Sequence, residues 1–237
     1  MAAGPVLAAG GYHAVGIASV AATLLAAAVG WTLPEVRTAS PARRPRRSGD
    51  SFRRTYAAVL LGGLTEVRRT SSARRALMLL AVLMGVGAMD EYVPLLVQST
   101  HVGTTGLTLL VGVVTAGYAV GGLFAGRGTR RLAPMLAIAA ACLAAGALSG
   151  RPAGIVLVAA TFGIGQWAQA AAEASLQDHI ADDARATVTS LAGLGAEVAG
   201  MAVFAGYALG SGWAGPGPLF ALAAVPYLAL ALIVRRH

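Results

Sequence analysis

Two adjacent carboxylates in an otherwise apolar segment are the residues of this sequence best suited to chemistry. Asp90 and Glu91 lie within residues 76–97 and follow Arg75 by about 15 positions, which places them roughly 22 Å from it along a helix. If this segment crosses a membrane, each charge costs roughly 3 kcal/mol or more and should face a cavity or a partner. Because neighbouring helical residues point about 100° apart, we expect one acid to bind a proton or a substrate and the other to assist. The alternative is that both acids reach the water at the outer headgroups.

Pro94 gives a second signal at the same place. A proline has no N–H to donate to the carbonyl four residues earlier, which here belongs to Asp90. We therefore predict a kink in the helix beside the two acids.

Glu197 is a third candidate for proton binding. It lies about 12 residues after Arg185, roughly 18 Å along a helix and close to the middle of a membrane. The surrounding segment "SLAGLGAEVAGMAVFAG" is rich in small residues, which allow helices to approach closely. We predict that Glu197 is buried and can take up and release protons. The alternative is a neutral carboxyl that bonds a neighbouring helix.

Two amides share one face of another apolar segment. Gln166, Gln169 and Glu173 follow at i, i+3 and i+7. Such amides either bind polar groups of a substrate or hold helices together by hydrogen bonds, and the sequence favours neither role.

Glu173 lies towards the end of that segment, where arginines could pair with it. The pairing would form a conformational latch, or only a solvated ion pair worth under about 1 kcal/mol. The candidate gating residues are Glu173, Arg127, Arg130 and Arg185.

The composition indicates that these residues lie in membrane spans. The chain of 237 residues is 57% hydrophobic and only 12% charged, unlike a soluble domain. About 20 apolar residues in a helix cross a hydrocarbon core of about 30 Å. Seven segments approach this length: 12–31, 76–97, 107–126, 132–149, 152–175, 188–210 and 219–234. We predict an all-α membrane protein with seven transmembrane helices embedded in a lipid bilayer.

The arginines predict the orientation of the spans. The chain has no lysine, and 17 of its 18 arginines fall on one side of the predicted membrane, eleven of them between residues 37 and 75. The positive-inside rule then places the N-terminus outside and the C-terminus in the cytoplasm, in a plasma or inner membrane. Since topology accounts for the net charge of +8, we expect no nucleic-acid partner.

The basic connection at 37–75 divides into two parts. Residues 38–50 contain Pro, Ser and Arg without an apolar face, which is typical of a disordered linker. Residues 51–69 carry apolar side chains at helical spacing and predict an amphipathic helix on the inner leaflet. A flexible basic linker held near anionic lipid is the alternative.

Four glycines form overlapping GxxxG pairs, Gly117 with Gly121 and Gly122 with Gly126. They predict close helix packing.

Several classes of function find no support. Cys142 is the single cysteine and no two histidines stand four residues apart on a helix, so we expect no metal and no cofactor. Retinal would need a lysine in a span, and intramembrane hydrolysis would need a paired catalytic set. We predict that the protein is not an enzyme.

Four stretches, in this order, are similar to parts of one known family. "AAGPVLAAGGYHAVG" resembles the end of a fifth span with its glycine-proline motif, and "WTLPE" the close of a sixth. "GLFAGRGTRR" is similar to the loop signature GxxxDRxGRR, with Gly126 in place of the aspartate and Thr129 in place of a glycine. "EASLQDHIADDARATVTSL" is similar to the loop between the tenth and eleventh spans of many exporters. Together they resemble the second half of a major facilitator superfamily transporter, drug-exporter-like and largely without its N-terminal domain.

The resemblance implies three domains. Residues 1–36 would be a remnant of the N-terminal domain with one span, residues 37–75 the cytoplasmic linker, and residues 76–237 the C-terminal six-helix domain.

The implied activity is alternating-access transport. The spans carry acids, amides and aromatic residues but no basic residue, which favours protons and neutral or cationic solutes. We therefore expect a proton-coupled antiporter for the efflux of small amphipathic or drug-like compounds. The alternative is a non-transporting truncated or split-gene subunit that needs a separate N-terminal six-helix partner.

Overall fold

The computed structural model describes residues 71–126, 131–178 and 185–235, together with short helical stretches between residues 13 and 29. The chain divides into two units, Met1–Phe52 and Arg53–His237. In the first unit, the described residues are helical, within the predicted span 12–31. The predicted amphipathic helix at 51–69 and the linker before it lie outside the described residues.

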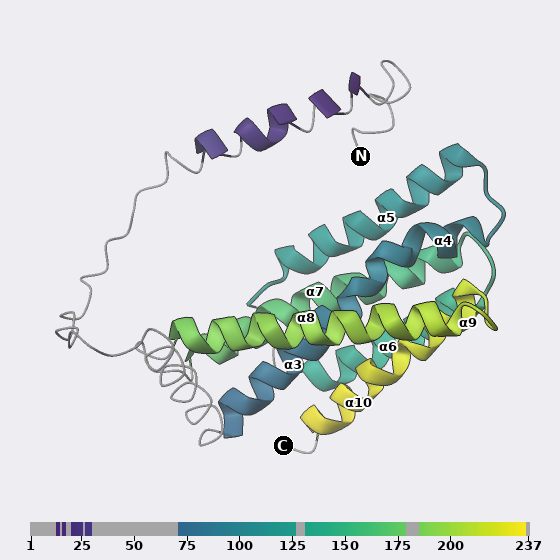
Figure 1. Ribbon diagram of the computed structural model, residues 1–237. Coiled ribbons are helices and arrows are strands. Elements are labelled where there is room, and N and C mark those ends of the chain that lie inside the picture. The colour runs from purple at the N-terminus through teal and green to yellow at the C-terminus, as the bar shows by residue number, and fades with distance from the viewer. Residues whose placement is uncertain are drawn as a thin grey trace. The chain divides into compact units, whose positions relative to one another are not determined.

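The described part of the second unit is entirely helical (Figure 1). The elements, in chain order, are α3 (Ser71–Gly87), η1 (Ala88–Tyr92), α4 (Val93–Gln98), α5 (Thr104–Leu123), α6 (Leu132–Leu148), α7 (Gly154–Asp178), α8 (Arg185–Gly210), α9 (Pro216–Leu222) and α10 (Ala224–Arg235).

These elements form six helical segments, because α3, η1 and α4 run on as one and α9 and α10 as another. Among the described residues, five segments are long and apolar enough to cross a membrane, and α6 is a shorter apolar helix of 17 residues. Each coincides with a predicted span, although α3 begins at Ser71, before the predicted start at residue 76. The prediction of an all-α membrane fold is confirmed.

The segments run up and down, so that alternate ends meet at one end of the bundle (Figure 1). The start of α3 with Arg74 and Arg75, the start of α6 beside Arg131 and the end of α10 at Arg235 share that end. Arg151, in the turn between α6 and α7, lies at the opposite end. Arginines therefore gather at one end of the bundle, as the alternation of charge in the loops predicts.

Helix α7 lies at the centre of the bundle. It packs against α5, α6 and α3, and many of its residues are buried there, whereas Val156 and Ala160 are exposed. Contacts with three neighbouring segments place much of α7 in the core of the bundle. Helix α7 therefore holds the other helices in place.

Small residues set the distance between α3 and α8. A Cβ added at Gly85 would clash with Ala199, and a Cβ at Gly195 would lie 3.2 Å from the Cβ of Ala81. Since lipid tails are as apolar as the protein interior, close backbone approach rather than the hydrophobic effect favours such contacts. The small residues around Glu197 thus pack as the sequence predicts.

The four glycines of the overlapping pairs differ in their surroundings. Gly117 meets the carbonyl oxygen of Ala159, and Gly121 meets that of Gly163, so both lie in the contact of α5 with α7. Gly122 and Gly126 have no atom of a neighbouring helix within 4 Å. Gly126 instead lies in the turn after α5 with a φ of 77°, a left-handed conformation that glycine adopts freely. The predicted packing role thus holds for one pair and not for the other, because only one face of α5 contacts α7.

A buried hydroxyl joins α6 to α7. Thr161 is 1% exposed, and its hydroxyl oxygen lies 3.0 Å from the Ala139 carbonyl oxygen of α6 and 3.1 Å from the Leu157 carbonyl oxygen of its own helix. Hydrogen bonds between transmembrane helices contribute about 0.6 kcal/mol on average.

Replacing Thr161 by valine is expected to lower the free energy of unfolding by about 0.6 kcal/mol, since the shape is kept and the donor is lost. The matched variant Thr161→Ser keeps the donor and loses a buried methyl group, at about 0.8 kcal/mol. Unfolding in detergent, followed by tryptophan fluorescence, measures both variants. The same measurement on Thr161→Ala gives the loss when the hydroxyl and the methyl group are both removed. If the valine variant were as stable as the wild type, the hydroxyl would contribute nothing to the α6–α7 contact.

Candidate functional site

The first segment of the bundle changes its helix type at the two acids. Helix α3 ends at Gly87, and Ala88–Tyr92 form the 3₁₀-helix η1 before α4 resumes with Pro94 in its first turn. The backbone N–H of Val93 donates to the Asp90 carbonyl oxygen, the acceptor that Pro94 has no N–H to reach. The helix thus changes to i→i+3 bonding beside Pro94, a change that we call the break, and a kink at this place stays a prediction.

Asp90 meets a tyrosine of the next helix. The Tyr118 hydroxyl of α5 donates to Asp90 Oδ2 over 3.4 Å, longer than the usual range of about 2.5–3.0 Å, so the hydrogen bond is weak. The two residues stand 28 positions apart in the chain. The sequence places Tyr118 in a span, but nothing in its spacing indicates that it faces the acid.

Asp90 and Glu91 line one pocket between the first segment and α5. Its volume is about 340 Å³, and its lining consists of Asp90, Glu91, Val93, Val111, Val114, Thr115 and Tyr118. Both acids are exposed. The pocket therefore presents two carboxylates, the phenol of Tyr118 and the hydroxyl of Thr115 among apolar walls, with no basic group in its lining.

The residue after the two acids belongs to an aromatic cluster with α8. Tyr92, which follows Glu91, stacks on Tyr207 of α8 with ring centres 3.7 Å apart and an interplanar angle of 10°. Phe204 meets Tyr92 edge-on at 5.9 Å. These rings tie the break to α8, and sequence analysis did not single them out, although Phe204 and Tyr207 stand at helical spacing.

Gln166, Gln169 and Glu173 of α7 differ in their burial and in their hydrogen bonds. Gln169 Nε2 lies 3.3 Å from the Leu83 carbonyl oxygen and donates to it, which joins α7 to α3 one turn before the break. Of the two roles left open for this amide, the structure shows helix bonding. Gln166 is partly buried, and Glu173 is exposed near the end of α7.

The predicted latch falls largely on residues without a described side chain. Arg127 and Arg130 lie outside the described residues, and Arg185 is described only as the first residue of α8. Pairing of Glu173 with these arginines therefore stays a prediction.

Glu197 differs from its prediction. Its side chain is exposed on the side of α8 that turns away from the bundle, rather than buried. Helix α8 packs chiefly on α3, and the small residues Gly195, Ala196 and Ala199 take that contact. Because small residues face the neighbour, the larger acid points outward.

The family of the chain follows from comparison with known proteins. A family model described as Major Facilitator Superfamily matches residues 1–204. The chain belongs to the Major Facilitator Superfamily. The comparisons with curated proteins and with solved structures return no match.

As a member of the Major Facilitator Superfamily, the chain is a multi-pass membrane protein of a transport family and not an enzyme. Members of this superfamily bind small-molecule substrates, so the pocket of Asp90 and Glu91 is a candidate substrate site. The pocket with the two carboxylates lies in a segment that is long and apolar enough to cross a membrane. The 3₁₀-helix η1 contributes Asp90 and Glu91 to the lining of this pocket.

Proposed function

We propose that this member of the superfamily exports small amphipathic or drug-like compounds in exchange for protons, with Asp90 as the residue that gains and loses the proton. The observation that carries the proposal is the contact of Asp90 with Tyr118 at the break of the first segment, inside a pocket.

The pocket offers Asp90 two competing ligands. The ionised carboxylate accepts the Tyr118 hydrogen bond and attracts a cationic or dipolar solute, whereas a bound proton removes the charge. A ligand shifts a conformational equilibrium only by its difference in affinity for the two states. Proton and solute drive opposite steps of an alternating-access cycle if each favours a different state of the break.

The amphipathic class of solute follows from the surroundings of the acids. The valines of the lining supply apolar wall, and Tyr118 supplies an aromatic ring. A volume of about 340 Å³ falls at the lower end of ligand pockets. Aromatic faces also attract cations, by about 0.5–2 kcal/mol each.

The proposal includes an orientation. The end of the bundle that gathers Arg74, Arg75, Arg131 and Arg235 would face the cytoplasm, by the positive-inside rule, in a plasma or inner membrane. Asp90 then lies in the outer half of the bilayer, and a proton would enter it from outside.

Transport is best measured on the purified full chain in vesicles with an imposed pH gradient. We expect a fluorescent amphipathic cation to accumulate against the proton flow, and a pH-sensitive dye to report proton movement when the cation is added. A protonophore should abolish the accumulation. Uptake that only equilibrates the cation, at the same rate with and without the pH gradient, would contradict proton coupling and leave facilitated transport.

A second candidate function rests on Glu197. An exposed acid near the middle of α8 faces hydrocarbon unless other protein covers it, and exposure to lipid is costly. This favours a subunit whose α8 is covered by a separate N-terminal six-helix partner. The same vesicle assay separates the candidates: transport by the chain alone would exclude the subunit role, and transport that requires a co-reconstituted six-helix partner would support it.

A further inference from the structure

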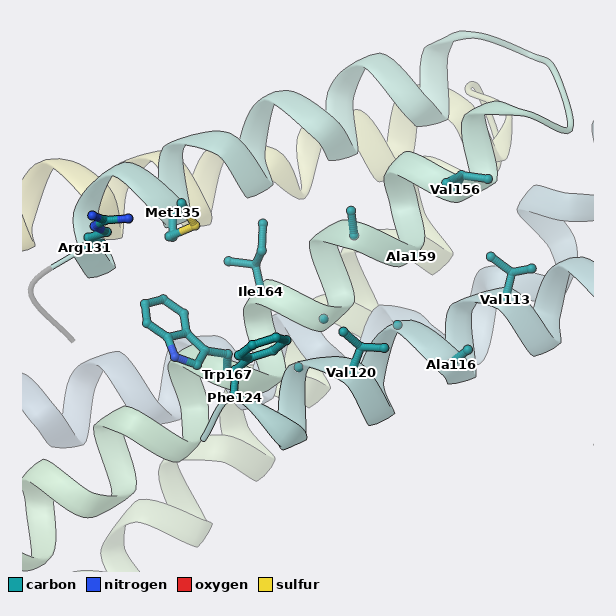
Figure 2. A pocket seen from close by; sticks show the side chains of 14 residues that line it. Val113, Ala116, Val120, Phe124, Arg131, Met135, Val156, Ala159, Ile164 and Trp167 are labelled. Atoms are coloured by element: carbon teal, nitrogen blue, oxygen red, sulfur yellow. The ribbon is translucent and has the colours of Figure 1, made fainter. Parts of the chain in front are cut away.

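A second and larger hollow lies away from the acids, between α5, α6 and α7 (Figure 2). Its volume is about 670 Å³, and its lining shares no residue with the pocket of Asp90. We call it the lateral groove. Small residues of α5 and α7, among them Ala116, Ala159, Ala160 and Gly163, leave the space open.

The depth of the lateral groove matches one leaflet of a bilayer. Its lining runs along α5 from Val113 to Phe124 and along α7 from Val156 to Trp167. Each stretch advances 11 residues, about 16 Å at a helical rise of 1.5 Å per residue. Half of a hydrocarbon core of about 30 Å is about 15 Å. An acyl chain of ordinary length can therefore lie along the groove from the membrane surface to the midplane.

The polar groups of the lateral groove gather at one end. Among the described residues of the lining, Arg131 is the only charged one, and Trp167 is the only other one with a side-chain N–H. Figure 2 shows both at the same end, with Phe124 and Met135 beside them, while Val113 and Val156 lie at the other. Arg131 precedes α6 at the arginine-bearing end of the bundle and is exposed.

We propose that the lateral groove binds an anionic phospholipid of the leaflet on the arginine side, with the phosphate at Arg131 and one acyl chain along α7. The apolar walls match an acyl chain, and the one charge stands where the headgroup would lie. A cationic solute, the kind that the Asp90 pocket suits, is repelled by Arg131. The site is thus a lipid site beside the transport pathway, and it stands whether or not the proposed export is correct.

Photocrosslinking tests whether a phospholipid occupies the lateral groove. The purified full chain is reconstituted in nanodiscs with equal amounts of phosphatidylglycerol and phosphatidylethanolamine, and one of the two carries a diazirine in its acyl chain. Mass spectrometry of the digested protein locates the crosslinks. We expect them to concentrate in residues 113–124 and 156–167 and to favour phosphatidylglycerol about fivefold, the effect of one arginine near a membrane surface.

Two matched pairs of variants test the contacts. Arg131→Gln should remove the preference for phosphatidylglycerol, whereas Arg235→Gln, at the same end of the bundle and outside the groove, should keep it. Ala160→Phe should fill the groove and lower its crosslinking, whereas Ala119→Phe, exposed on α5 outside the lining, should not.

Three results would overturn the proposal. One is labelling spread evenly over all exposed helix faces, and another is a headgroup preference that Arg131→Gln leaves unchanged. The third is a groove that no lipid probe reaches because protein covers it. Melting temperatures of the four variants, measured in the same nanodiscs, separate a filled groove from a misfolded chain.

Discussion

The Asp90→Asn chain is expected to lose proton-coupled export altogether while it folds normally. Asparagine has the size of aspartate and still accepts the Tyr118 hydrogen bond, but it cannot take up or release a proton. The side chain is exposed in its pocket, so the substitution leaves no cavity and buries no new polar group. Substrate-driven proton movement in vesicles measures the loss, and size-exclusion chromatography checks the fold.

Glu91→Gln is the matched control for this substitution. Glu91 adjoins Asp90 and lines the same pocket, but the contact with Tyr118 belongs to Asp90. We expect the Glu91 variant to keep proton coupling, with weaker binding of cationic compounds.

Tyr118→Phe should have a smaller effect, about threefold on the apparent affinity, which corresponds to the average of about 0.6 kcal/mol for a hydrogen bond between transmembrane helices. If Asp90→Asn moved protons as the wild type does, and Glu91→Gln did not, the roles of the two acids would be reversed.

Gly121→Val is expected to be the most destabilising substitution in the contact of α5 with α7. A Cβ at this position meets the Gly163 carbonyl oxygen, a backbone atom that cannot rotate away. Helix α5 would have to shift from α7, on which it mainly packs. Overpacking of this kind costs about 1–3 kcal/mol, which corresponds to a melting temperature lower by roughly 2–12 °C.

Gly122 provides the control one residue away. A Cβ there meets nothing within 4 Å, and valine is a better helix former than glycine by a few tenths of a kcal/mol. Gly122→Val is therefore expected to leave the melting temperature unchanged or to raise it slightly. Thermal unfolding of both variants in one detergent measures the difference. Equal losses of stability would mean that α5 does not approach α7 through Gly121.

The sequence by itself predicted the features that local chemistry determines. Uninterrupted apolar length gave the positions of the six described segments, since satisfaction of the backbone in lipid requires helices. Pro94 indicated the place of the break beside Asp90, since a missing N–H acts on a carbonyl four residues away. The order of weak motifs was enough to indicate the family that the family model then showed.

Only the tertiary structure decided which face of each helix meets a neighbour. It paired Asp90 with Tyr118, turned Glu197 outward, and separated Gly121 from Gly122. In a soluble protein the apolar face of a helix reveals its buried side. In a membrane, lipid and protein interior are similarly apolar, so hydrophobicity does not distinguish the packed face from the exposed one. Contacts between segments far apart in the chain determine which way each side chain points. These contacts therefore also form the pocket of the two acids and the lateral groove.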